Sequence, residues 1–296
     1  MFQTDKPLIT NALVEELHIK SAVPKPTAKG TPLRYSSAYG CGRQQGYAGS
    51  GFTPTEPMDE SGAWATGLGT IVHEALQEAL NRKFEFVEFE VPSKIGDISG
   101  SCDALIAVEE IDQNNVLTGT HVLYELKTMG TYSFDKQTGW NRMRGTSSDG
   151  EGPALKAIVQ AGLNALGIMT ENPSIKIEWL VMGSMTFEAL SKNKASKMGV
   201  EGVNRFLAEY WIPREEWEPM VMAERDRMNA MAWTLNQGYL PDRIAMDDEG
   251  NPFTLNPNIN KFWQCDYCAF RTACIQDGAS HIRIMDSVLA NEGGTE

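Results

Sequence analysis

A glutamate and a lysine stand two residues apart inside the run HVLYELKT (residues 121–128), whose other members are mostly apolar or β-branched. Such a composition is typical of a strand. Side chains two positions apart point to the same face of a strand, so Glu125 and Lys127 project together. Two charged groups on a buried face are costly unless they pair with each other or hold a metal ion. The run therefore indicates either a solvated ion pair on an edge strand or a polar site built into a sheet.

The apolar pattern along the rest of the chain predicts a compact α/β core with further helices around it. The expected elements, in chain order, are a helix at 65–83, strands at 84–92, 97–110 and 121–128, a helix at 153–168, a strand at 175–187 and a long helix from Arg214 to a stop at Gly238. Residues 130–152 contain GTSSDGEG and are expected to be a mobile loop. The first 33 residues end in a Pro-, Gly- and Lys-rich segment, which is typical of an arm or linker.

A second acid and a histidine occur in similarly apolar surroundings. Asp103 precedes an apolar run in the strand before Glu125, and His73 lies on the 65–83 helix. Taken singly, these are a turn acid and a structural histidine. If the two strands form a hairpin, Asp103 and Glu125 lie opposite each other. Two carboxylates, an imidazole and a backbone carbonyl such as that of Leu126 suit Mg²⁺ or Mn²⁺. Lys127 would then hold or activate a water beside a phosphate.

The chain has five cysteines, and three of them follow the spacing C-x2-C-x5-C near the carboxyl end: Cys265, Cys268 and Cys274. Cys41 lies far upstream. Four thiolates from two distant segments suit a closed iron–sulfur cluster or a structural zinc ion. The C-x5-C half is unusual for a zinc knuckle. Cys102, next to Asp103 but facing away from it on a strand, is expected to be a buried structural thiol.

The formal charge of −13 argues against a broad basic surface for duplex DNA, although a local basic groove is compatible with it. No apolar run approaches the ~20 residues of a membrane span. The amino terminus lacks the basic-then-apolar profile of a signal peptide, so a cytoplasmic protein is expected, with no membrane partner. An odd number of cysteines in a reducing compartment argues against a disulfide framework.

Taken in order, these motifs resemble the active-site signature of the PD-(D/E)XK nuclease superfamily. Asp103 and the sequence Glu125-Leu-Lys127 match its acidic and E-x-K parts. The segment GTIVH, which ends at His73, is similar to the histidine motif of the RecB-like branch. In that branch a helical glutamine is followed four residues later by a tyrosine. This chain has Gln160 in the glutamine place and Asn164 in the tyrosine place, so the role of Asn164 departs from the family pattern.

The cysteine spacing also resembles the iron–sulfur nucleases of that branch, among them the CRISPR-associated exonuclease and the nuclease part of AddB. In these proteins an upstream cysteine and a C-terminal triplet bind a 4Fe–4S cluster, which implies the same role for Cys41, Cys265, Cys268 and Cys274. The implied fold is a PD-(D/E)XK restriction-endonuclease-like α/β core, with a central mixed sheet flanked by helices. A helical iron–sulfur-binding region would join its N- and C-terminal segments. The resemblance covers roughly residues 34–281 as a single nuclease domain and leaves 282–296 as a tail.

The resemblance implies a metal-dependent exonuclease that hydrolyses single-stranded or end-containing DNA in recombination, repair, or phage or CRISPR DNA processing. The implied ligands of Mg²⁺ or Mn²⁺ are His73, Asp103, Glu125 and the Leu126 carbonyl, and the implied catalytic residues are Asp103, Glu125, Lys127 and Gln160. No P-loop of the form GxxxxGK[ST] is present. Candidate partners besides DNA are therefore a helicase, an annealing protein or a CRISPR adaptation protein.

Candidate DNA contacts are cations that could equally be solvated surface charges: Arg142, Arg144 and Lys156, with Arg43 and Arg271 as weaker candidates. Three aromatic side chains could stack on bases or pack the loop onto the core: Tyr132, Phe134 and Trp140. Two other classes of function stay open. One is a catalytically idle DNA-binding scaffold, and the other is a redox-sensing regulator whose iron–sulfur cluster is the functional element.

Overall fold

The computed structural model describes residues 33–56, 60–111, 117–200, 202–258, 263–278 and 282–292. The expected arm lies almost entirely outside these ranges, as does most of the loop expected between the second and third strands. None of the described helices combines the length and the apolar composition that crossing a membrane requires.

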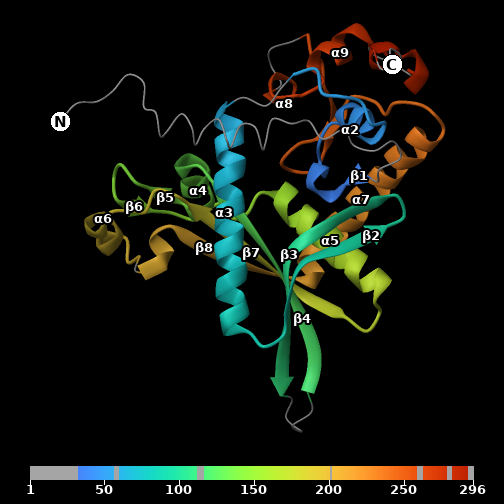
Figure 1. The fold of residues 1–296 in the computed structure, drawn as a ribbon. Coiled ribbons are helices and arrows are strands. Elements are labelled where there is room, and N and C mark those ends of the chain that lie inside the picture. Colours follow the sequence, from blue (N-terminus) through green and yellow to red (C-terminus); the bar gives the residue numbers. More distant parts are fainter. Residues whose placement is uncertain are drawn as a thin grey trace, which may run out of the picture.

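A mixed six-stranded sheet forms the centre of the fold (Figure 1). Its strands are β1 (Leu33–Arg34), β2 (Val87–Ile95), β3 (Ile98–Ile111), β4 (Leu117–Met129), β7 (Lys176–Thr186) and β8 (Leu207–Pro213). The order is β1-β3-β4-β7-β8, and β2 also pairs with β3. The β2–β3, β3–β4 and β7–β8 pairs are antiparallel, whereas β4 and β7 are parallel. A parallel pair needs a crossover connection, and this crossover includes the helix α5 (Leu155–Glu171).

Helices cover both faces of this sheet (Figure 1). On one face, α3 (Glu60–Lys83) packs Val72, Leu76 and Leu80 against buried residues of β3, β4 and β7. On the other face, α5 and α7 (Arg214–Asn236) enclose the largest apolar core. A Cβ atom at Gly162 of α5 would collide with Val221 of α7, so the close approach of these two helices requires a glycine there.

Segments from the two halves of the chain lie side by side at one end of the molecule (Figure 1). The helix α2 (Gly42–Gly49) packs near α8 (Trp263–Asp266) and α9 (Arg271–Gln276), and the rings of Tyr47 and Phe270 are 5.3 Å apart. The fully buried Arg43 donates from Nε to the Pro241 carbonyl at 2.7 Å. These contacts join positions about two hundred residues apart in the sequence.

The remaining elements are short: η1 (Tyr35–Ser37), α4 (Thr131–Thr138), β5 (Trp140–Asn141), β6 (Thr146–Ser147), α6 (Lys192–Lys197), η2 (Gly202–Arg205), β9 (Ile244–Met246), β10 (Pro252–Thr254), η3 (Ile284–Asp286) and α10 (Val288–Glu292). The expected helices and strands are present, with boundaries that differ by a few residues. The structure adds the strand β8, and it places α4, β5 and β6 in residues 130–152, where a mobile loop was expected.

Candidate functional site

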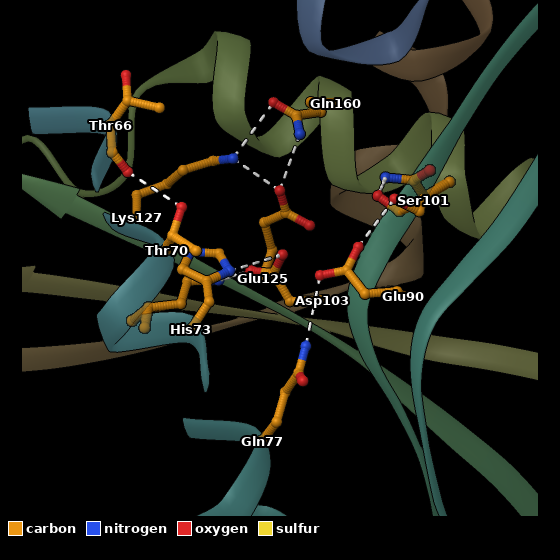
Figure 2. A network of polar contacts seen from close by, with 12 residues as sticks. Thr66, Thr70, His73, Gln77, Glu90, Ser101, Asp103, Glu125, Lys127 and Gln160 are labelled. Carbon is orange, nitrogen blue, oxygen red and sulfur yellow. Dashed lines mark hydrogen bonds and ion pairs between the residues drawn. The ribbon is translucent and has the colours of Figure 1, made fainter. Parts of the chain in front are cut away.

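The charged pair of β4 is held by a glutamine of α5. Lys127 Nζ donates to Glu125 Oε1 at 2.6 Å and to Gln160 Oε1 at 3.3 Å. Gln160 Nε2 also donates to Glu125 Oε1, at 2.8 Å (Figure 2). Since β4 pairs with β3 on one side and β7 on the other, it is not an edge strand. Glu125 is 1% exposed, so a polar site inside the sheet fits better than a solvated ion pair.

Asp103 joins this group from the neighbouring strand β3. The backbone N–H of Leu126 donates to Asp103 Oδ2 at 2.6 Å. The other oxygen, Oδ1, lies 3.3 Å from Nδ1 of His73 on α3. Hydrogen bonding to Asp103 raises the pKa of His73 above its usual value, although burial opposes that effect. The two oxygens of Asp103 therefore face two neighbours, the β4 backbone and the α3 imidazole.

One buried oxygen in the group lacks a partner. Both hydrogen bonds to Glu125 go to Oε1, and Oε2 is buried without a hydrogen-bond donor among the described residues. Burial raises the pKa of Glu125 to about 7, and the nearby Lys127 ammonium opposes the rise. Leaving a buried polar atom without a partner costs about 1–3 kcal/mol. Oε2 of Glu125 is therefore available to bind a cation.

Glu90 of β2 is an acid that sequence reasoning missed. Its carboxylate lies near His73 and Asp103, and one ligand atom from each of the three residues fits within 4.8 Å of the others. Gln77 Nε2 donates to Glu90 Oε1 at 3.4 Å, and the hydroxyl of Ser101 donates to Glu90 Oε2 at 3.2 Å. The sequence FEFVEFEVP contains three glutamates, and nothing in that pattern distinguishes Glu90 from the other two. This group of one imidazole and two carboxylates is a possible divalent-metal site.

Asn164 links the helix α5 to the strands β2 and β3. It lies one helical turn after Gln160 and is fully buried. Its Nδ2 donates to the Ser101 carbonyl at 3.0 Å, and its Oδ1 accepts from the Ser93 hydroxyl at 3.2 Å. Pro92 stands opposite Ser101 in the β2–β3 ladder and has no N–H to offer. Asn164 therefore supplies a donor to the strand two residues before Asp103.

Four of the five cysteines line one small cavity between α2 and the C-terminal helices. These are Cys41, Cys265, Cys268 and Cys274. Burial raises the pKa of Cys41 to about 11 and that of Cys268 to about 12, so bare thiolates are strongly disfavoured there. In the described ranges, no three cysteine sulfurs lie within 4.8 Å of one another. The fifth cysteine, Cys102, is fully buried in the main core away from this cavity.

An arginine lies against the same cavity. Arg243 is 7% exposed, and its Nε donates to the Cys274 sulfur at 3.1 Å. Nη2 donates to the backbone carbonyls of Cys274 and Gly278. In the part of the chain that the structure describes, no carboxylate forms an ion pair with Arg243. Burying a guanidinium without an anionic partner is costly in free energy. Thiolates at the cavity would supply an anionic partner for Arg243.

The candidate DNA contacts fall into two groups. Arg142 is mostly buried and already paired, with Nε 2.5 Å from Asp135 Oδ1 and Nη1 donating to the Glu188 carbonyl at 2.7 Å. Arg43 is fully buried, whereas Arg271 binds Asp266 beside the cysteines. Arg144 and Lys156 are exposed, and Lys156 lies one turn before Gln160 on α5.

Among the three aromatic candidates, Phe134 is fully buried against Trp140, with the ring centroids 5.3 Å apart. These two side chains pack the 130–152 segment together. Tyr132 is 81% exposed and has no such packing role.

The mixed sheet, the flanking helices and the group of carboxylates with a histidine define an α/β protein with a candidate divalent-metal site. No family model matches the chain, and no curated protein matches its sequence. A solved structure described as that of SSO0001 is 17% identical, with a TM-score of 0.47 over 92% of this chain and 98% of that one. An alkaline exonuclease (LHK-Exo) from Laribacter hongkongensis is 12% identical, with a TM-score of 0.35 over 75% of this chain and 96% of that one. Both likenesses are too remote to carry an argument about activity.

Proposed function

We propose that this chain is a divalent-metal-dependent nuclease of the PD-(D/E)XK type that hydrolyses phosphodiester bonds of DNA. The observation that carries the proposal is the buried carboxylate of Glu125. One of its oxygens is held by Lys127 and Gln160, while the other is free beside Asp103. A buried charge is normally paired or bound to a metal. The salt bridge with Lys127 accounts for Oε1 of Glu125, but it does not account for the burial of Oε2 without a partner.

The residues that would hold Mg²⁺ or Mn²⁺ are Asp103, Glu125 and His73, together with the carbonyl of Leu126. Carboxylate oxygens are the ligands that these hard cations prefer, and the donor set therefore fits. When bound, a divalent cation would lower the pKa of a water molecule and offset negative charge on the phosphate.

Lys127 and Gln160 would orient the reacting groups. The ammonium of Lys127 lies 2.6 Å from Glu125, so it can donate to a water or a phosphate oxygen next to the carboxylates. Gln160 bonds both members of the pair, which fixes the carboxylate and the ammonium relative to each other. Positioned groups of this kind contribute about 10²–10⁴-fold to the rates of proton-transfer reactions.

The substrate that we propose is single-stranded DNA or DNA with free ends, and the reaction is exonucleolytic. The exposed cations Arg144 and Lys156 are the better candidates for phosphate contacts, because Arg142 is already paired. Recombination, repair, or phage or CRISPR DNA processing would supply such ends. A helicase, an annealing protein or a CRISPR adaptation protein would be a suitable partner. The proposed nuclease domain spans residues 34–281.

We also propose that the four cysteines of the cavity bind a 4Fe–4S cluster. Four soft ligands at one buried place suit either such a cluster or a zinc ion. The C-x5-C spacing of Cys268 and Cys274 is unusual for a zinc knuckle, and this favours the cluster. Anaerobically purified protein should contain iron and sulfide in near-equal amounts, whereas one bound zinc ion without sulfide would contradict the cluster.

An assay with linear and covalently closed circular single strands of the same sequence tests the activity. With Mn²⁺, the wild-type chain should degrade the linear strand and leave the circle largely intact. Asp103→Asn and Lys127→Met should each lower the rate by ~10²-fold or more. Glu178→Gln, a change of an acid outside the site, is the matched control. No cleavage by the wild-type chain would support the idle scaffold instead, and equal loss of both strands would indicate an endonuclease.

A further inference from the structure

A buried positive charge at the cysteine cavity has no carboxylate to balance it. Arg243 is 7% exposed, and its Nε donates to the Cys274 sulfur at 3.1 Å. The described residues that line the cavity include two arginines and no aspartate or glutamate. The other arginine, Arg271, already binds Asp266 at 2.8 Å. Within the described ranges, the charge of Arg243 therefore faces cysteines and backbone carbonyls only.

The backbone directs this guanidinium at one cysteine in particular. Arg243 immediately precedes β9, and its own carbonyl accepts from the N–H of Leu255 at 2.7 Å. Nη2 donates to the carbonyls of Cys274 and Gly278 at the end of α9. A cation beside the last carbonyls of a helix can be purely structural. That role explains the two carbonyl bonds, but it does not explain the bond to the sulfur.

Neutral thiols would not supply the missing negative charge. Burial raises the pKa of Cys41 to about 11 and that of Cys268 to about 12, so both are protonated near pH 7 unless a metal binds. Cysteines that bind a metal must lose their protons. The cavity therefore becomes anionic when it is occupied, and a fixed guanidinium favours the occupied state.

A second buried guanidinium lies close to the first cysteine in the sequence. Arg43 follows Cys41 by two residues on α2 and is fully buried. Its Nε donates to the Pro241 carbonyl, whereas Nη1 and Nη2 have no hydrogen-bond partner among the described residues. Tyr47, one helical turn further along α2, lines the cavity. Two buried guanidinium groups without carboxylates thus occur in this region, which independently indicates an anionic group there.

The reduction potential of an iron–sulfur cluster depends on its net charge, on hydrogen bonds to its sulfurs and on its exposure to solvent. One-electron reduction adds a negative charge to a group that is already anionic. A nearby positive charge and an N–H···S bond therefore stabilise the reduced form more than the oxidised form. Charges in a buried cavity are screened less than charges at the surface, so the effect is larger there.

We infer that Arg243 is a positioning residue that acts through Cys274 and raises the reduction potential of the cluster held in the cysteine cavity. The inference rests on the proposed 4Fe–4S cluster and adds the residue that sets its potential. Arg243 supplies both the charge and the N–H···S bond, and it is held in place by the Leu255 N–H on one side and by the α9 carbonyls on the other.

A redox titration of the anaerobically purified holoprotein tests this inference without relying on nuclease activity. The reduced cluster is measured by electron paramagnetic resonance at each potential. Arg243→Gln should lower the equilibrium constant for reduction at least ~10-fold, which is about 59 mV for a one-electron couple. Arg243→Lys retains the charge and should restore part of that loss. Arg214→Gln is the matched control, because Arg214 is paired with Glu218 outside the cavity lining, and its potential should equal that of the wild type.

The outcomes separate the role of Arg243 from the presence of the cluster. One zinc ion without sulfide in the wild-type chain would refute the cluster and the inference with it. A wild-type cluster whose potential is unchanged in Arg243→Gln would overturn the role of Arg243 alone, even if thermal unfolding showed that the variant is less stable.

Arg243→Lys decides the case in which Arg243→Gln does not retain the cluster. Retention of the cluster by the lysine variant, with a potential close to that of the wild type, would support the requirement for a positive charge. Loss of the cluster from both variants, each shown by circular dichroism to be folded, would overturn the inference, because the charge would then not be what the cavity requires.

Discussion

Replacing Asn164 with leucine should destabilise the protein by about 2–4 kcal/mol. Asn164 is fully buried, and leucine would remove both of its hydrogen bonds while keeping a similar volume. The Ser101 carbonyl and the Ser93 hydroxyl would lose their partner, at about 1–3 kcal/mol for each group that stays buried. The facing residue in the ladder, Pro92, has no N–H that could replace the lost donor.

Urea unfolding followed by circular dichroism measures this change. The midpoint should fall while the denaturant slope stays constant, which assigns the loss to stability and not to a changed unfolded state. Asn204→Leu is the control, since Asn204 is exposed and its replacement should cost less than ~0.5 kcal/mol. A loss below ~0.5 kcal/mol for Asn164→Leu would refute the role of this amide in the strand.

Replacing Asn164 with the larger tyrosine tests how tightly the space around this residue is packed. The ring of the buried Tyr35 lies next to Asn164, and a Cβ atom at Gly100 would meet both side chains. Asn164→Tyr should therefore overpack the core, at a typical cost of 1–3 kcal/mol in addition to the lost hydrogen bonds. A stable Asn164→Tyr variant would show that this space can open.

Three further predictions concern the polar centres. In EDTA, Glu125→Gln should gain stability relative to the wild type as the pH rises from 5 to 8. Because the folded-state pKa of about 7 exceeds the usual 4.5, the stability that the protonated form contributes is fully present below pH 4.5 and is lost as the pH rises from there to 7, by about 3 kcal/mol; equal pH profiles in thermal unfolding would contradict this. Cys268→Ala should lose both iron and stability, whereas Cys102→Ala should retain the iron content of the wild type, as measured by elemental analysis. Arg243→Gln should release the iron of the cysteine cavity to a chelator at least ~10-fold faster than the wild type, and Arg243→Lys should restore part of the retention. An unchanged release rate would mean that the guanidinium stabilises only the backbone carbonyls to which it donates.

The sequence was sufficient for the parts of the fold that depend on simple periodicity. The apolar spacing of α3 and α5 and the long runs of β3, β4 and β7 could be predicted because one face of each is buried. The strand β8 was missed, since LAEYWIP is short and both its tryptophan and its glutamate are exposed. The 130–152 segment was expected to be mobile because it is rich in glycine and serine. Its order comes from Trp140, whose ring contacts both Phe134 and Arg142 across the segment.

The candidate site divides in the same way. Asp103, Glu125 and Lys127 could be proposed because polar residues in apolar strands are unusual, and His73 and Gln160 because they fit a resemblance. Glu90 could not be singled out, since it is one of several exposed glutamates in this part of the sequence and its neighbours His73 and Asp103 come from other elements of the fold. Arg243 was missed for a related reason, because its relation to the cysteines exists only after two distant segments meet.

The cavity between α2 and the C-terminal helices also has a consequence for biosynthesis. Cys41 is made more than two hundred residues before Cys274, and at roughly 5–20 residues per second the delay is on the order of ten to fifty seconds. During that time the apolar side of α2, including Tyr47, has no partner from the C-terminal helices to cover it. The nascent chain would therefore depend on chaperones until its last cysteine has left the ribosome. A chain that terminates before Cys274 should be degraded, even though every strand of its central sheet has been synthesised.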